Sequence, residues 1–106
     1  MTDTATETGG DCFVVALHAL RMNPELRLAH GTVKGWTGPR HCHAWVEDAY
    51  ECHDTSNGHD LHVPKELYYA LGNVEDVVTY TYDEAAMAAL SHGHYGPWDA
   101  RFEGWA

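Results

Sequence analysis

The first apolar segment of the chain, CFVVALHALRM, places its apolar side chains on one helical face. Four of them are spaced i, i+3, i+4 and i+7, namely Phe13, Ala16, Leu17 and Leu20. This spacing predicts an amphipathic helix, with Asp11 as its candidate N-cap and Asn23-Pro24 at its end. Cys12 is therefore expected in or beside the first turn of that helix.

Shorter patterns in the middle of the chain predict β-strands. One strand is indicated by residues that alternate along the chain, Leu26, Leu28 and His30. A loop over residues 35–40, rich in Gly, follows and carries Trp36. Residues 42–54, CHAWVEDAYECHD, predict a β-hairpin with a two-residue turn at Asp48-Ala49.

The second half of the chain adds two helices and a strand. Residues 64–71 predict a short helix, residues 74–82 a strand, and residues 84–93 a last helix that Asp83 caps. The aromatic tail HYGPWDARFEGWA is expected to pack back on the domain, because free aromatic rings would expose a large apolar surface.

These elements predict one α+β domain over residues 9–106, since a chain of 106 residues is too short for two cores. Its antiparallel sheet would pack against the N-terminal helix that carries the cysteine. Residues 1–8 are polar, without apolar periodicity, and predict a flexible leader.

The charge of the chain excludes two classes of partner. Six basic residues stand against 16 acidic ones, a net charge of −10 with His neutral. The basic residues are scattered singly, whereas nucleic-acid binding needs clustered Lys and Arg. We therefore expect no nucleic acid and no anionic membrane as a partner. No apolar run approaches the ~18 to 20 residues of a membrane span, and the N-terminus lacks a secretory pattern, so a cytoplasmic location is predicted.

Cys12 has the features of a reactive thiol. It follows Gly9-Gly10 and begins a helix, where unpaired N–H groups and the helix dipole favour a thiolate and can stabilise an oxyanion. The chain has three cysteines, and an odd number argues against a disulfide framework. Packing, metal binding or catalysis then remain as possible roles of the cysteines. The alternative is that Cys12 is a small apolar residue buried at the start of an apolar helix.

The predicted hairpin places His43 opposite Asp54. Directly opposed side chains share a face of the sheet, with Cβ atoms roughly 4.5 to 5.5 Å apart. Asp54 would then hold one ring nitrogen of His43 while the other nitrogen faces a thiol. A base and the group that orients it are what nucleophilic catalysis requires. The alternative is a surface His–Asp pair on a half-exposed hairpin.

Three segments together resemble a known family. A Gly-x-Cys at the head of a helix, then His43-Ala44-Trp45-Val46-Glu47, then Asp54-Thr55-Ser56, is similar to the transglutaminase-like branch of the papain-like cysteine protease superfamily. The resemblance covers residues 9–58, about half of the chain. It implies a minimal core of that fold, with Cys12 as the nucleophile, His43 as general base and acid, and Asp54 as the orienting acid.

The chain departs from the family at the oxyanion position. It contains no Gln, so the papain-type oxyanion Gln is missing. The candidates for oxyanion or substrate binding are therefore the backbone near Gly10, the indole donors Trp36 and Trp45, and His30 at the end of its strand. Thr55 also stands where that branch often has Pro.

These residues predict a cysteine-dependent hydrolase or acyltransferase, of peptidase, amidase or deamidase type, that acts on an amide or ester. Its substrate would be a peptide, a protein or a small amide or ester, and no cofactor is expected. A different class is a non-catalytic protein-interaction module on the same fold.

A small zinc-binding protein is a further alternative. Two Cys-His steps, Cys42-His43 and Cys52-His53, lie ten residues apart, with His41, His59 and His62 nearby. Adjacent strand residues point to opposite faces, however, so one step does not easily chelate one ion, and the spacing matches no zinc-ligand turn. We therefore predict no metal site and expect Cys42 and Cys52 to be buried in the sheet.

Overall fold

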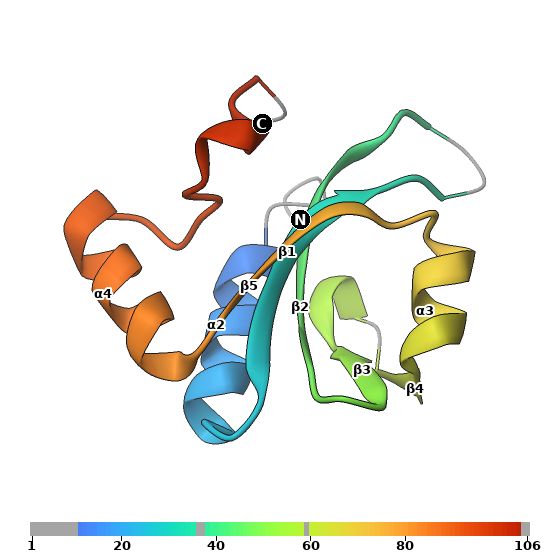
Figure 1. The fold of residues 1–106 in the computed structure, drawn as a ribbon, viewed down its shortest axis with the longest axis horizontal. Coiled ribbons are helices and arrows are strands. Elements are labelled where there is room, and N and C mark those ends of the chain that lie inside the picture. Colours follow the sequence, from blue (N-terminus) through green and yellow to red (C-terminus); the bar gives the residue numbers. More distant parts are fainter. Residues whose placement is uncertain (1–10, 36–37, 59, 105–106) are drawn as a thin grey trace.

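The computed structural model describes residues 11–35, 38–58 and 60–104, and it contains one five-stranded sheet (Figure 1). The strand order is β4-β3-β2-β1-β5, and every neighbouring pair is antiparallel. The strands are β1 (Arg27–Val33), β2 (His41–Glu47), β3 (Glu51–Asp54), β4 (Leu61–Pro64) and β5 (Glu75–Tyr80). Strands β1 to β4 form a meander, and helix α3 then returns the chain to β5 at the opposite edge. The predicted α+β class with an antiparallel sheet is confirmed.

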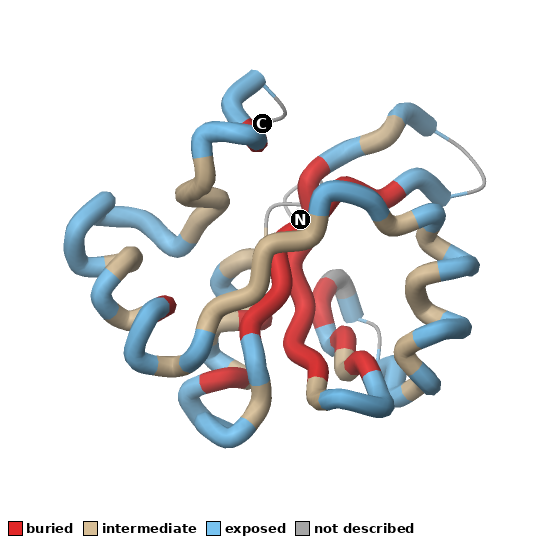
Figure 2. Tube along the Cα trace, viewed as in Figure 1, coloured by how far each residue is buried: buried red, intermediate tan, exposed pale blue. Residues whose placement is uncertain are grey.

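Helices cover both faces of the sheet. Helix α2 (Cys12–Met22) and helix α4 (Tyr82–His92) lie on one face, and helix α3 (Lys65–Leu71) lies on the other (Figure 1). In each of the central strands β1 and β2, six of the seven residues are buried. Figure 2 shows this buried centre of the sheet in red. The site residues on these strands are therefore held by packing from both sides.

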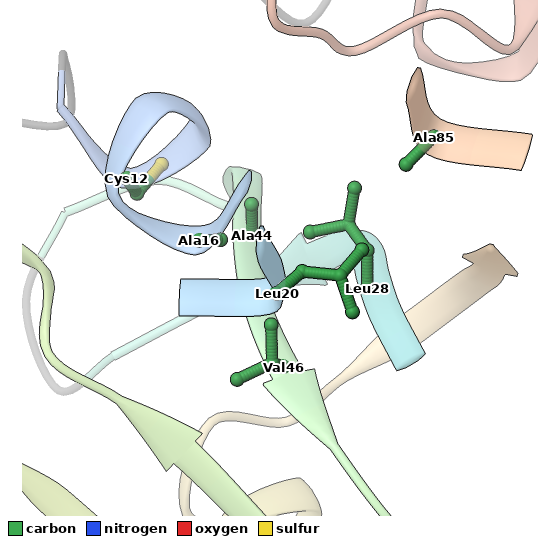
Figure 3. Packing of buried hydrophobic residues seen from close by; sticks show 7 residues of the cluster. All are labelled: Cys12, Ala16, Leu20, Leu28, Ala44, Val46 and Ala85. Carbon is green, nitrogen blue, oxygen red and sulfur yellow. The ribbon is translucent and has the colours of Figure 1, made fainter. Parts of the chain in front are cut away.

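The α2 face carries the larger apolar cluster (Figure 3). Leu20, Leu28 and Val46 are buried at its centre, and Cys12 lies where the cluster meets the start of α2. The helix begins at Cys12, as the apolar spacing predicts, and the side chain and backbone N–H of Asn23 bond the Ala19 carbonyl at its end. Asp11 occupies the N-cap position without a side-chain capping hydrogen bond.

The hairpin register differs from the sequence prediction. Glu47 pairs with Cys52 and Val46 with His53, so the turn lies at Ala49-Tyr50, one residue later than predicted. The carboxylate of Asp48 accepts hydrogen bonds from the backbone N–H groups of Tyr50 and Glu51, at 2.7 Å each, which fixes the turn there. Moving the turn by one residue moves the strand pairing by two, so His43 and Asp54 still share a face.

Three further elements refine the sequence prediction. The sequence pattern does not predict the short edge strand β4, and α3 begins only after Pro64. The last helix is capped by Thr81 in a capping box with Glu84 and not by Asp83. The described part of the tail packs back on the domain as expected, with Phe102 buried. The predicted leader over residues 1–8 lies outside the described residues.

None of the described helices has the length and apolar character needed to cross a membrane.

Candidate active site

The structure brings His43 and Asp54 together where strand β3 separates from β2. Pairing of the two strands is limited to Val46–His53 and Glu47–Cys52, whereas β2 extends back to His41. The Nε2 atom of His43 lies 2.8 Å from Oδ2 of Asp54. Both side chains are about nine-tenths buried, so the pair is not the surface contact that the sequence left open.

Asp54 is held by three further donors. The hydroxyl of Tyr68 on α3 donates to Oδ2 at 2.6 Å, and the hydroxyl and backbone N–H of Ser56 donate to Oδ1 at 2.7 and 3.1 Å. Burial favours the neutral acid, but the hydrogen bond and charge of His43, together with these donors, hold the pKa of Asp54 well below its usual range. The carboxylate therefore stays charged at neutral pH.

His43 lies between this carboxylate and the thiol of Cys12. Burial favours the neutral imidazole, but the hydrogen bonds and charges of Asp54 and Cys12 outweigh it and raise the pKa of His43 to about 9. Since Nε2 contacts Asp54, Nδ1 is the ring nitrogen left for Cys12. At neutral pH the ring is an imidazolium that donates to both neighbours.

Cys12 reaches this pair from helix α2. The helix packs on the opposite face of the sheet from α3, yet its first residue interacts with His43 because β2 has no β3 partner at that position. Burial, followed by the charge and the hydrogen bond of Asp54, raises the pKa of Tyr68. The structure therefore gathers the three residues of the predicted triad.

Cys12 is the first residue of helix α2, and a helix dipole contributes about half a positive charge at its N-terminus. The thiol itself is completely buried. Access for a substrate therefore requires side chains around Cys12 to move.

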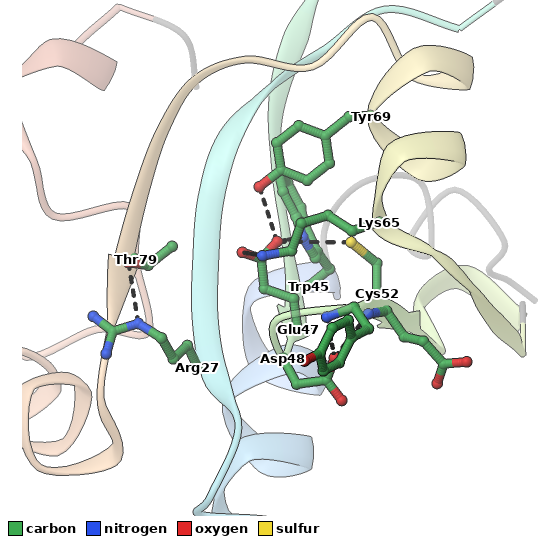
Figure 4. A network of polar contacts seen from close by, with 10 residues as sticks. Arg27, Trp45, Glu47, Asp48, Cys52, Lys65, Tyr69 and Thr79 are labelled. Carbon is green, nitrogen blue, oxygen red and sulfur yellow. Dashed lines mark hydrogen bonds and ion pairs between the residues drawn. The ribbon is translucent and has the colours of Figure 1, made fainter.

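Three alternate residues of β2, His43, Trp45 and Glu47, form one stripe on the α3 face. The His43 ring stacks on Trp45, with centroids 6.1 Å apart and planes at 26°, and the Trp45 indole N–H donates to Glu47 at 2.9 Å. Glu47 also accepts from the Tyr69 hydroxyl at 2.9 Å and pairs with Lys65 at 3.0 Å (Figure 4). Buried Glu47 thereby locks the indole that supports the catalytic candidate His43.

An open cleft adjoins the pair on the α3 face. It has a volume of about 320 Å³, and His43, Asp54, Ser56 and Tyr68 form part of its wall. Cys12 is not among the described residues that line it. A ligand in this cleft would therefore contact His43 and Asp54 among the described lining residues, but not Cys12.

The structure does not bring all oxyanion and substrate-binding candidates to this place. His30 is buried on the α2 face against Phe13, Tyr80 and Trp98, on the other side of the sheet from the cleft. The N–H of Trp45 is already bonded to Glu47. Gly10 and Trp36 lie outside the described residues.

Two residues of the site were missed in the sequence. Ser56 follows Asp54 by two positions, a spacing at which an Asp side chain commonly accepts from the backbone, and this signal was available. Tyr68 lies 14 positions away on a helix, and only the packing of α3 on the sheet brings it to Asp54.

The remaining cysteines are buried in the sheet, as predicted. Burial, followed by the charge of Cys12, raises the pKa of Cys42 to about 11, and burial, followed by Glu47, raises that of Cys52 to about 12. In the ranges that the structure describes, no group of three or more His, Cys, Asp or Glu side chains is arranged to hold a metal ion. His59, one of the zinc candidates, lies outside those ranges.

No family model, no curated protein and no solved structure matches this chain. The resemblance to the transglutaminase-like branch therefore rests on the residues of the chain itself.

Proposed function

We propose that this protein is a cysteine-dependent hydrolase or acyltransferase that acts on an amide or ester. The observation that carries the proposal is the position of His43, which hydrogen-bonds Asp54 at 2.8 Å through Nε2 and also hydrogen-bonds Cys12, for which Nδ1 is the ring nitrogen left. The orienting acid Asp54, the base His43 and the nucleophile Cys12 thus form one hydrogen-bonded chain, as nucleophilic catalysis requires.

The reaction begins with attack of the Cys12 thiolate on the substrate carbonyl carbon, which forms an S–C bond. The carbonyl π electrons move to oxygen and return as the C–N or C–O bond to the leaving group breaks. The imidazolium of His43 transfers its Nδ1 proton to the departing amine or alcohol. Water or an amine, deprotonated by the now neutral His43, then attacks the thioester and releases the thiolate.

Asp54 maintains this geometry throughout the two steps. Its negative charge stabilises the imidazolium and fixes which nitrogen faces the sulfur. The dipole of α2, whose first residue is Cys12, would stabilise the negative oxygen of the tetrahedral intermediate, and this chain has no Gln side chain to assist.

A second candidate function is a non-catalytic interaction module on the same fold. The complete burial of Cys12 favours it, because a nucleophile must meet its substrate. In this alternative the Cys12–His43–Asp54 group is a buried polar network that fixes α2 on the sheet.

Turnover of p-nitrophenyl esters, followed by intact mass spectrometry, distinguishes the two. The proposal predicts a burst of p-nitrophenol and a mass increase of one acyl group on the wild-type chain. Cys12→Ala is expected to abolish both, with a rate loss of roughly 10³-fold or more, while Cys42→Ala, on the same strand as His43, retains them. A Cys12→Ala protein as active as the wild type would contradict the proposal.

A further inference from the structure

The cleft beside His43 has a chemical character that the proposed reaction does not explain. Four aliphatic side chains from three different elements line it: Val33 of β1, Leu61 and Val63 of β4, and Leu71 of α3. Leu61 and Leu71 are 42% and 56% exposed, although large aliphatic side chains gain from burial. An apolar ligand between them would remove this surface from water.

Charged groups in the cleft are few and already paired. Among the described lining residues there is no Lys or Arg, and the single carboxylate is Asp54, which accepts from His43, Tyr68 and Ser56. The charge of His43 is balanced by Asp54, and His41 is the other histidine of the wall. A charged ligand would therefore lose hydration without gaining a dedicated partner.

The cleft also has the size of a substrate site. Its volume of about 320 Å³ lies at the lower end of the range for small-molecule pockets, and such sites combine mostly apolar walls with a few polar groups. Besides His41, the polar side chains here are His43 and Asp54 of the triad and Ser56 and Tyr68, which hold Asp54. A substrate whose carbonyl approaches Cys12 past His43 would leave its acyl chain in this space.

We propose, on the basis of the proposed function, that this cleft binds the acyl portion of the substrate and selects uncharged aliphatic acyl groups over charged ones. Leu71 is the specificity-determining residue with the simplest test, because it is exposed and lies near the end of α3. Leu67 of the same helix is similarly exposed, at 46%, and is absent from the described cleft wall, so it is the matched control.

The experiment compares kcat/KM for p-nitrophenyl acetate, butyrate, hexanoate and hemisuccinate with the full chain. A rise of up to about fourfold per methylene is expected from acetate to hexanoate, which corresponds to about 0.8 kcal/mol per buried methylene, and the hemisuccinate should be the poorest substrate. Leu71→Lys should lower the ratio of hexanoate to hemisuccinate by about tenfold or more, since it adds a cation and removes apolar surface, while Leu67→Lys leaves it unchanged.

A second readout does not depend on turnover. Binding of N-methylhexanamide and N-methylacetamide to the Cys12→Ala chain, followed by amide chemical shifts, should show tighter binding of the hexanamide with changes centred on Val63 and Leu71. Such binding without turnover of any ester would support the cleft as an acyl-binding site and contradict the proposed reaction. Two results would contradict acyl binding in the cleft and leave the proposed reaction unaffected. One is turnover with equal kcat/KM for acetate and hexanoate, and the other is equal effects of Leu71→Lys and Leu67→Lys.

Discussion

The Nε2 atom of His43 and the Oδ2 atom of Asp54 lie 2.8 Å apart although neither residue is the strand partner of the other. His43 pairs with Gly31 of β1, and Asp54 pairs with Leu61 of β4. The contact forms diagonally across the point where β3 leaves β2. The same separation leaves His43 open to Cys12 of helix α2.

Removing the charge of Asp54 should change the protonation of His43. In Asp54→Asn, burial of the ring is no longer offset by a carboxylate, so we expect the pKa of His43 to fall from about 9 by more than about one unit. Activity should fall by roughly 10²-fold or more, because the imidazolium loses its stabilising charge. An NMR titration of the imidazole resonances measures the shift.

The matched control is Asp60→Asn, which removes an exposed carboxylate 3.4 Å from His62 and leaves the triad intact. In the wild type, acylation that needs the His43 proton should decline as the pH rises through about 9. In Asp54→Asn this decline should begin at lower pH. A His43 pKa that stays near 9 in Asp54→Asn would show that another group supports the imidazolium.

Tyr68 should act as a positioning residue through Asp54. Tyr68→Phe removes a 2.6 Å hydrogen bond to the carboxylate, and a hydrogen bond to a charged group contributes about 1.5–3 kcal/mol. We expect a loss of that size in the free energy of unfolding, measured with urea, together with a lower kcat. The substitution also raises the pKa of Asp54, since one of the groups that lower it is gone.

Tyr69→Phe is the comparison for this effect. The neighbouring Tyr69 hydroxyl donates to Glu47, outside the triad, at 2.9 Å. Its loss should reduce stability with little change in kcat. Equal losses of kcat in both variants would mean that Tyr68 acts only through the stability of α3.

The sequence predicts the helices and strands of this site better than it predicts the register in which the strands pair. Helix α2 follows from four apolar positions and the Asn23-Pro24 stop, because these signals are local. The sequence predicts the hairpin turn one residue too early because it has no Gly to mark the turn. The hydrogen bonds from the backbone N–H groups of Tyr50 and Glu51 to the Asp48 carboxylate decide its position. The shared face of His43 and Asp54 survives this error, since the register changes by an even number.

Other features depend on contacts that no local pattern records. Strand β4 has four residues and exists only as the edge partner of β3, so its pattern is too short to predict a strand. His30 ends the predicted alternation and resembled a cleft residue. In the sheet its neighbour across β1–β2 is Ala44, which faces α2, so His30 points away from His43.

Burial of His30 should limit stability in acid. No polar partner contacts either ring nitrogen in the described structure, and burial among Phe13, Tyr80 and Trp98 lowers the pKa of His30 to about 3. The unfolded chain takes up a proton there near pH 6.5, whereas the folded chain does not until about pH 3. The free energy of unfolding therefore falls as the pH decreases from about 6.5, by up to about 1.4 kcal/mol per unit.

His30→Leu removes the loss of stability that comes from proton uptake at His30 in the unfolded chain. It also replaces an unpaired imidazole by an apolar side chain. We expect the variant to be more stable than the wild type by about 1 kcal/mol at neutral pH, with the difference growing at about pH 4.5. His43 does not contribute to this change, because it is protonated in both states below about pH 6.5. Urea unfolding at the two pH values provides the measurement, and a difference independent of pH would refute the assignment.

The rate of alkylation at each cysteine tests the central claim most directly. The chain carries its own controls, since burial raises the pKa of Cys42 to about 11 and of Cys52 to about 12. After brief treatment with iodoacetamide at about pH 6.5, peptide mass spectrometry should find Cys12 modified about tenfold faster or more than either control, and this advantage should disappear in His43→Ala. Equally slow modification of all three cysteines in the wild type would contradict an activated thiol and favour the interaction module.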